Sequence, residues 1–267
     1  MSMHPSISIN TLCLPAAPLG ALAERVARIG ARGISPDLDQ VTAFGVAESA
    51  RAVRAAGLEV ATLTHRAFGF ATPIETGTAR ERLLRSIAIA GEIGAPTIIM
   101  TTGGRGALGW PRAAEVFADA LAPCAEAASK AGIRLGIEPT SHLYSDVSIA
   151  HRLTDATILA RKAGIDVMID LFACWVDADI DVAIADAVPL TGLVQVSDYV
   201  YGDRGLPCRA VPGDGAVPLD RLIPAIVRAG FQGWFDLEII GPRLQAEGED
   251  AGLRRAADFI GNLLEAA

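Results

Sequence analysis

Short runs of β-branched and other apolar residues alternate along the chain with longer stretches in which apolar residues recur every three or four positions. The short runs are typical of buried strands, and the longer stretches are typical of amphipathic helices. Several of the predicted helices end in a glycine just before the next strand, as helices commonly do. The predicted strands are Ile7–Cys13, Gly33–Leu38, Leu58–Arg66, Pro96–Thr102, Arg134–Thr140, Asp166–Trp175, Gly192–Asp198 and Gly233–Ile240. The helix-ending glycines are Gly30, Gly57, Gly94, Gly132, Gly164 and Gly230.

Eight strands that alternate with eight helices predict a parallel sheet, and eight such units close naturally into a (β/α)8 TIM barrel. The alternative is an open doubly wound sheet, which usually has a Gly-x-Gly-x-x-Gly turn after its first strand. Here the first strand leads into Leu14–Pro18, which has no such turn. Because no linker or change in composition interrupts the pattern, we expect residues 1–267 to form a single α/β domain. The longest irregular connection, Tyr199–Ala216, follows the seventh strand, where a barrel places its active site.

Composition and charge narrow the classes of function. The 267 residues are 51% hydrophobic, which supplies a sizeable core, yet no run of about 18 uncharged apolar residues could span a membrane. The net charge of −8, without a basic cluster, would be repelled by phosphate backbones, so we expect no nucleic-acid partner. We expect a small-molecule substrate instead. A homo-oligomer is compatible with the sequence.

Cysteine usage and the first residues suggest a compartment. The four cysteines form no Cys-x-x-Cys pair, and the chain does not begin with the basic and apolar segments of a signal peptide. We therefore expect reduced thiols and a cytoplasmic location.

Polar side chains stand near the carboxyl ends of four predicted strands. Side chains alternate between the two faces of a strand, so the apolar neighbours of these residues define the outer face. By this parity Glu138, Asp170, Gln195 and Glu238 point into the barrel. The same parity turns Gly136, Ser197 and Asp236 inward.

Carboxylates that converge on one barrel mouth raise each other's pKa, and burial adds to the cost, so they need compensation. A divalent cation is the simplest remedy, and the oxygen donors Glu138, Asp170, Gln195 and Glu238 suit Mn²⁺ or Mg²⁺ better than Zn²⁺. We expect Mn²⁺ first, with Mg²⁺ or Co²⁺ as alternatives. The competing interpretation is that an arginine neutralises the acids, and Arg209 and Arg243 are available for that role.

Five segments in the second half of the chain resemble, in order, motifs of the xylose isomerase-like barrel superfamily. The resemblance points to its sugar phosphate isomerase/epimerase branch, which includes epimerases, isomerases and dehydratases. The segments are Gly136–Pro139, Met168–Phe172, Val194–Asp198, Arg209–Gly215 and Phe235–Glu238.

The resemblance implies roles for individual residues. Glu138, Asp170 and Glu238 match the family's three carboxylate metal ligands, and Gln195 stands where the fourth ligand is usually histidine, as it does in some dehydratases. Arg209 matches an arginine that contacts substrate oxygens. The epimerases' substrate-binding histidine is replaced here by Ala173, which shifts weight toward a lyase.

Three further residues are candidates for substrate binding. His65 ends the third strand, and His142 follows Glu138 by four positions, so either could face the barrel mouth. Trp175 could provide a flat apolar wall. The ordinary alternatives are that both histidines are satisfied loop or core residues and that the tryptophan belongs to the core.

These features predict a divalent-metal-dependent isomerase or epimerase of a keto-sugar or cyclic polyol ketone. Glu138 and Glu238 are the predicted general base and acid, and proton abstraction next to the carbonyl would form a metal-bound enediolate. Loss of a β-hydroxyl from the same species would make the protein a dehydratase, of the inosose or 3-dehydroshikimate type. A phosphodiesterase related to the apurinic-site endonucleases is disfavoured by four histidines and the acidic charge, and a non-catalytic ligand-binding barrel is the remaining alternative.

Overall fold

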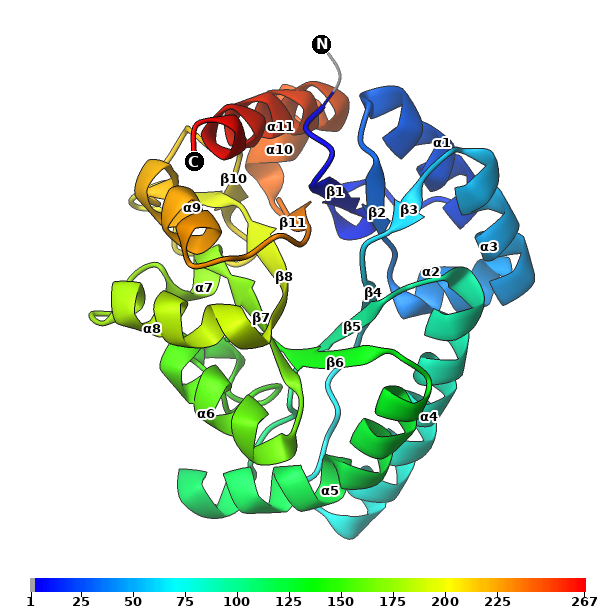
Figure 1. Cartoon of the computed structure of the whole chain (residues 1–267), viewed down its shortest axis with the longest axis vertical. Helices are drawn as coiled ribbons and strands as arrows, with labels where there is room; N and C mark the ends of the chain where they lie inside the picture. The colour runs from blue at the N-terminus through cyan, green and yellow to red at the C-terminus, as the bar shows by residue number, and fades with distance from the viewer. Residues whose placement is uncertain (1–2) are drawn as a thin grey trace.

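The structure, a computed structural model, describes residues 3–267, and Met1 and Ser2 lie outside the described residues. A ring of parallel strands occupies the centre, and helices surround it (Figure 1). The nine strands of this sheet are β1 (Ile7–Asn10), β2 (Gly33–Ser35), β3 (Glu59–Val60), β4 (Leu63–His65), β5 (Thr97–Met100), β6 (Arg134–Ile137), β7 (Asp166–Asp170), β8 (Thr191–Val196) and β11 (Phe235–Leu237). The predicted (β/α)8 barrel is therefore confirmed.

The barrel has nine strands rather than eight because the third predicted strand, Leu58–Arg66, is divided. Its first part, β3, pairs with β2, and its second part, β4, pairs with β5. The strand order is β3-β2-β1-β11-β8-β7-β6-β5-β4, so the two edges of the sheet are consecutive pieces of one chain segment. A parallel bridge between Asp37 and Thr64 draws the edges together. The sheet is thus nearly closed.

Helices follow the strands as the sequence pattern predicts. All six predicted helix-ending glycines have positive φ, which is the conformation that ends a helix and that glycine adopts without strain. The helices are α1 (Leu19–Ile29), α2 (Leu38–Phe44), α3 (Val46–Ala55), α4 (Pro73–Ile93), α5 (Trp110–Lys130), α6 (Leu153–Ala163), α7 (Leu171–Cys174), α8 (Ile180–Ala187), α9 (Leu219–Arg228), α10 (Pro242–Glu247) and α11 (Glu249–Glu265). Short 3-10 turns are η1 (Thr11–Cys13), η2 (His142–Tyr144) and η3 (Val188–Leu190). No helix among residues 3–267 has the length and apolar character needed to cross a bilayer.

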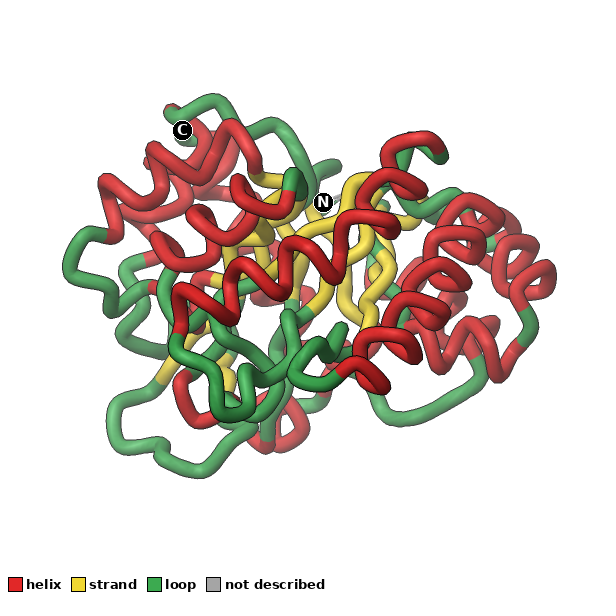
Figure 2. Tube along the Cα trace, turned by 90° about the horizontal axis from the view of Figure 1, so that it is seen from below, coloured by secondary structure: helices red, strands yellow, loops and turns green. Residues whose placement is uncertain are grey.

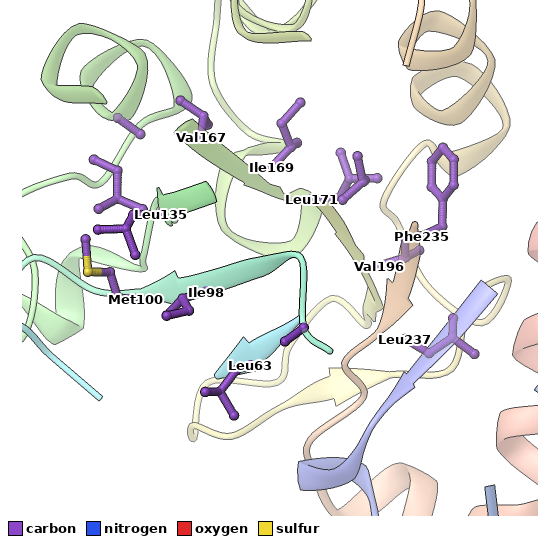
Figure 3. Packing of buried hydrophobic residues seen from close by; sticks show 14 of the residues in the cluster. Leu63, Ile98, Met100, Leu135, Val167, Ile169, Leu171, Val196, Phe235 and Leu237 are labelled. Atoms are coloured by element: carbon purple, nitrogen blue, oxygen red, sulfur yellow. The ribbon is translucent and has the colours of Figure 1, made fainter. Parts of the chain in front are cut away.

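The main core lies between the outer face of the barrel and the helices. Figure 2 shows the strands enclosed by helices, and Figure 3 shows apolar strand residues such as Val167, Ile169 and Leu237 from close by. These three side chains are fully buried in one large apolar cluster. They alternate along their strands with side chains that point into the barrel, such as Asp170 and Asp236, as the parity in the sequence predicts.

A small separate cluster fills the barrel interior. It consists of Ala61, Ile99, Met168 and Leu193, with Trp234 packed against it. A Cβ atom added to Gly136 would collide with the Met168 side chain, so glycine leaves the space that this methionine fills. The apolar plug closes the barrel beneath the polar residues at its rim.

Several predicted segments need correction. The strands predicted over Ile7–Cys13 and Gly33–Leu38 end at Asn10 and Ser35, and the residues beyond lead into η1 and α2. The sixth predicted strand, Asp166–Trp175, stops at Asp170, because the Asp170 side chain accepts a hydrogen bond from the Phe172 N–H and caps the short helix α7. The connection Tyr199–Ala216 is not wholly irregular. It contributes to an antiparallel pair between β9 (Asp198–Tyr199) and β10 (Arg209–Ala210).

The packing of α5 against the barrel predicts a large loss of stability for Phe117→Ala. The Phe117 ring is fully buried and lies 5.9 Å and 5.5 Å, centroid to centroid, from the edge-on rings of Phe68 and Phe70. We expect the free energy of unfolding to fall by about 3–5 kcal/mol in urea denaturation. Ile158→Ala, at a 48% exposed residue, is the control and should change it by less than about 0.5 kcal/mol. An equal effect of the two substitutions would contradict this packing.

Candidate metal centre and active site

Three carboxylates meet at the carboxyl end of the barrel. Glu138, Asp170 and Glu238 each offer an oxygen, and these oxygens all lie within 4.8 Å of one another. Together with Arg209 they line a pocket of about 340 Å³, here called the inner pocket. The arrangement agrees with the parity prediction, which turned all three acids into the barrel.

Strand pairing fixes where each carboxylate stands. Glu138 and Glu238 directly follow β6 and β11, and their N–H groups donate to the carbonyl oxygens of Met100 (3.3 Å) and Val196 (3.2 Å) on neighbouring strands. Asp170 is the last residue of β7. Because these backbone bonds hold the strand ends in register, the acids cannot separate without breaking the sheet.

The Cys13 thiol also helps to hold the backbone around Glu238. It donates to the Leu237 carbonyl oxygen at 3.2 Å and accepts from the Ile239 N–H at 3.0 Å. These two hydrogen bonds fix the backbone on both sides of Glu238, just beyond the end of β11. The sequence indicated only that Cys13 is a reduced thiol.

Arg209 lies among the acids. Its guanidinium donates to both Asp170 oxygens at 3.0 Å and 2.7 Å, lies 3.0 Å from a Glu238 oxygen, and stacks 4.6 Å from the Phe172 ring centroid. It also donates to the Ser197 hydroxyl at 3.1 Å. Arg209 therefore compensates part of the acids' charge, as the arginine interpretation proposed. The other candidate, Arg243, bonds to Asp203 on the surface.

The three acids carry more negative charge, when ionised, than Arg209 compensates. Burial, followed by the charges of Glu238 and Asp170, raises the pKa of Glu138 well above its usual value. Burial also raises the pKa of Glu238 to about 7, although Arg209 lowers it. When all are ionised, the three carboxylates and the Arg209 guanidinium sum to −2, which is the charge that one divalent cation neutralises. Arg66 also lines the pocket, but it is exposed and pairs with Asp39 at 3.4 Å.

Gln195 is the candidate for a fourth oxygen donor, although it does not line the inner pocket. It stands on β8 directly beside Asp170 of β7 and Asp236 of β11. Its Oε1 is buried and has no hydrogen-bond partner among the described residues, although buried polar atoms are nearly always paired. A hard divalent ion takes oxygen ligands of this kind, so the donor set fits Mn²⁺ or Mg²⁺.

Asp236 organises the barrel interior below Glu238. Its carboxylate accepts hydrogen bonds from Ser8 (2.6 Å), Ser35 (2.6 Å) and Asn10 (3.2 Å) on two neighbouring strands. Burial raises its pKa to about 6, while these three bonds lower it. Sequence parity placed Asp236 inside but did not reveal its partners.

Asp198 shapes the turn that follows Arg209. Its carboxylate accepts from the N–H groups of Gly213 (3.0 Å), Gly215 (2.8 Å) and Val217 (3.0 Å). A Cβ atom at Gly215 would collide with Asp198 and with the Tyr199 carbonyl, which explains the glycine there. Asp198 belonged to one of the resembling motifs, yet sequence reasoning assigned it no function.

The comparisons with known proteins identify the family. The model of the xylose isomerase-like TIM barrel matches residues 23–263. The chain belongs to the xylose isomerase-like TIM barrel family. This confirms the resemblance carried by the motifs. None of the curated protein sequences matches the chain.

Several solved structures superpose over almost the whole barrel. A protein from Sinorhizobium meliloti is 26% identical with a TM-score of 0.88, covering 97% of this chain and 98% of its own. A D-psicose 3-epimerase from Clostridium cellulolyticum, solved with D-tagatose, is 14% identical with a TM-score of 0.82, over 97% and 99% of the two chains. The IolI protein, solved with a zinc atom, is 14% identical with a TM-score of 0.83, over 98% of each chain. At 14% identity the likeness shows a shared fold.

The predicted substrate-binding residues other than Arg209 do not line the inner pocket. His65 has the same outward parity as Leu63, is 3% exposed, and contacts the Ser86 hydroxyl of α4 at 2.9 Å. His142 is exposed, and it lines a neighbouring larger pocket together with Trp175. His151, which precedes α6, lines that pocket too.

The buried His65 ring predicts a dependence of stability on pH. Burial lowers the pKa of His65 to about 3, whereas an unfolded histidine has a pKa of about 6.5. The unfolded chain therefore binds a proton first, so this contribution is complete above about pH 6.5 and is lost as the pH falls toward 3. Urea unfolding between pH 6.5 and 4 should show a slope of up to about 1.4 kcal/mol per pH unit from this group.

Two variants isolate that slope. His65→Gln should flatten the pH dependence, while the exposed His142→Gln should leave it as in the wild type. A His65→Gln curve parallel to that of the wild type would show that this ring does not stay neutral in the folded protein.

Proposed function

We propose that the protein is a divalent-metal-dependent isomerase or epimerase of polyhydroxylated carbonyl compounds, such as keto-sugars or cyclic polyol ketones. The observation that carries this proposal is the approach of the Glu138, Asp170 and Glu238 oxygens to within 4.8 Å of one another at the barrel mouth. Glu138, Asp170, Glu238 and Gln195 would hold the ion, and Mn²⁺ is the metal we expect. The zinc atom in the IolI structure supports a divalent ion in a barrel of this shape.

The protein's own groups would perform the proton transfers. A bound divalent ion supplies a Lewis acid that polarises a carbonyl and acidifies the neighbouring C–H bond. Glu138 then removes the proton from the α-carbon, and Glu238 holds a proton for return to the substrate. Arg209 keeps Asp170 and Glu238 in place through its bonds to both side chains.

The position of reprotonation would decide the product. Return of the proton to the same carbon gives an epimer, and return to the former carbonyl carbon gives the aldose–ketose isomer. The structures of a D-psicose 3-epimerase and an L-ribulose 3-epimerase, which share this fold, support chemistry of this type.

A dehydratase is the second candidate, favoured by Gln195 and by Ala173, which lines the inner pocket where the epimerases have a histidine. In that reaction the same proton abstraction is followed by departure of a β-hydroxyl as water. Product analysis separates the two, because only the dehydratase forms a new carbon–carbon double bond.

Metal affinity should depend on Gln195. We expect Gln195→Leu to weaken Mn²⁺ binding by at least about tenfold in isothermal titration calorimetry, because a ligand oxygen is removed. Gln232→Leu makes the same change at an exposed residue beside a different pocket and should leave the affinity unaltered. Unchanged Mn²⁺ binding by Gln195→Leu would remove this residue from the ligand set.

Proton exchange tests the catalytic roles. In a panel of keto-sugars, inososes and cyclic keto acids with Mn²⁺, the wild type should exchange an α-proton with D2O in at least one compound, as followed by NMR. Glu138→Gln and Glu238→Gln should slow that exchange by about 10²–10⁴-fold, because the group that moves the proton is gone. Glu81→Gln, at an exposed helix position, is the matched control. Exchange at the wild-type rate in either variant would refute that residue's role, and no exchange in any compound favours the ligand-binding alternative.

A further inference from the structure

A second and larger pocket adjoins the inner pocket. Its volume is about 620 Å³, against about 340 Å³ for the inner pocket, and we call it the outer pocket. The residues that line both pockets are Ser141, Phe172, Ala173, Leu206 and Cys208. Small-molecule sites in proteins have volumes of about 300–1,000 Å³, so the inner pocket alone is at the lower limit.

Aromatic rings form a continuous wall of the outer pocket. The Tyr199 ring lies 6.1 Å from that of Phe172 and 6.3 Å from that of Trp175, and Tyr201 lies 6.3 Å beyond Trp175. Phe172 is also the ring on which Arg209 stacks. The aromatic wall therefore starts beside the carboxylates and runs outward from them.

Exposed apolar residues gather at the same place. Leu143 and Val176, which are 62% and 66% exposed, line the outer pocket, and Tyr144, 40% exposed, lines the inner one. Tyr201 is 75% exposed and packs on Trp175. Exposed apolar residues scattered singly are ordinary, but a group at the rim of a pocket marks a surface that a ligand covers.

Most charged side chains around the outer pocket neutralise one another. Arg152 pairs with Asp179 and lies 4.0 Å from Asp177, and Asp203 bonds to Arg243 at 2.7 Å. Arg204 is exposed at the rim. The wall thus presents apolar and aromatic surface with paired charges, which suits a neutral, flat, apolar group.

We propose, resting on the proposed function, that the substrate has two parts. A polyhydroxylated carbonyl unit occupies the inner pocket, and an aromatic substituent attached to it lies against Trp175 and Tyr199 in the outer pocket. The substrate class is therefore an aryl-substituted keto-sugar, because a free monosaccharide would leave the aromatic wall uncovered.

Binding without reaction tests the aromatic subsite. The probes are phenyl β-D-glucopyranoside and methyl β-D-glucopyranoside, titrated into the Mn²⁺-loaded full chain and followed by calorimetry. We expect the phenyl compound to bind about ten- to hundredfold more tightly, because its ring leaves water for an apolar wall. Equal affinities for the two glucosides would overturn the proposal.

Substitutions test whether the difference in affinity between the two glucosides arises in the outer pocket. Trp175→Ala should abolish the preference for the phenyl compound, and so should Leu143→Asp, which puts a charge into the pocket at an exposed residue without disturbing the core. Ile74→Asp makes a similar change at an 83% exposed position in the first turn of α4 and should keep the preference. A preference that survives Leu143→Asp would show that the phenyl group binds elsewhere.

A second measurement separates this inference from the proposed function. It compares α-proton exchange in D2O for phenyl and methyl glycosides that both carry a ring ketone. Faster exchange of the phenyl compound, by about tenfold or more at limiting concentration, supports both claims. Equal exchange of the two ketones overturns the aromatic subsite and leaves the function intact. Absence of exchange, together with a binding preference for the phenyl glucoside, overturns the function and leaves the subsite intact.

Discussion

Repulsion among the carboxylates of Glu138, Asp170 and Glu238 governs the chemistry of this barrel. Each side chain sits at or just beyond a strand end whose backbone is hydrogen-bonded to its neighbours, so the negative charges cannot move apart. One guanidinium, that of Arg209, compensates part of this charge through Asp170 and Glu238. The remaining imbalance, together with the unpaired oxygen of Gln195, is the physical reason for assigning a divalent ion to this site.

The residues that stabilise the fold and the residues of the candidate site lie on opposite faces of the sheet. The large apolar cluster lies outside the barrel, between strands and helices, while the interior holds a small apolar plug and, above it, polar side chains. Asp236 and its three hydrogen-bond donors form a buried polar cluster in this interior. Polar groups can therefore face a ligand at the mouth while the outer core keeps the strands in register, and the aromatic wall beyond Phe172 extends the binding surface away from the ion.

The alternation of strand and helix segments predicted the barrel, and side-chain parity predicted its inward acids, because both patterns are local properties of the sequence. They could not divide the third strand, since the break between β3 and β4 serves barrel closure, which depends on strands distant in sequence. Parity could have excluded His65, whose side chain shares the outward face with Leu63. Other contacts depend on how the loops fold over the barrel rim, which no periodicity in the sequence encodes. Examples are the hydrogen bonds from Arg209 to Asp170, 39 residues away, and from the Gly215 N–H to Asp198.

Anomalous X-ray diffraction from crystals grown with Mn²⁺ would locate the ion. We expect one strong anomalous peak at the barrel mouth, within about 2.0–2.4 Å of oxygens from Glu138, Asp170, Glu238 and Gln195. An anomalous map without a peak among these four residues, at a saturating concentration of Mn²⁺, would show that no ion binds there and that Arg209 compensates the acids without one.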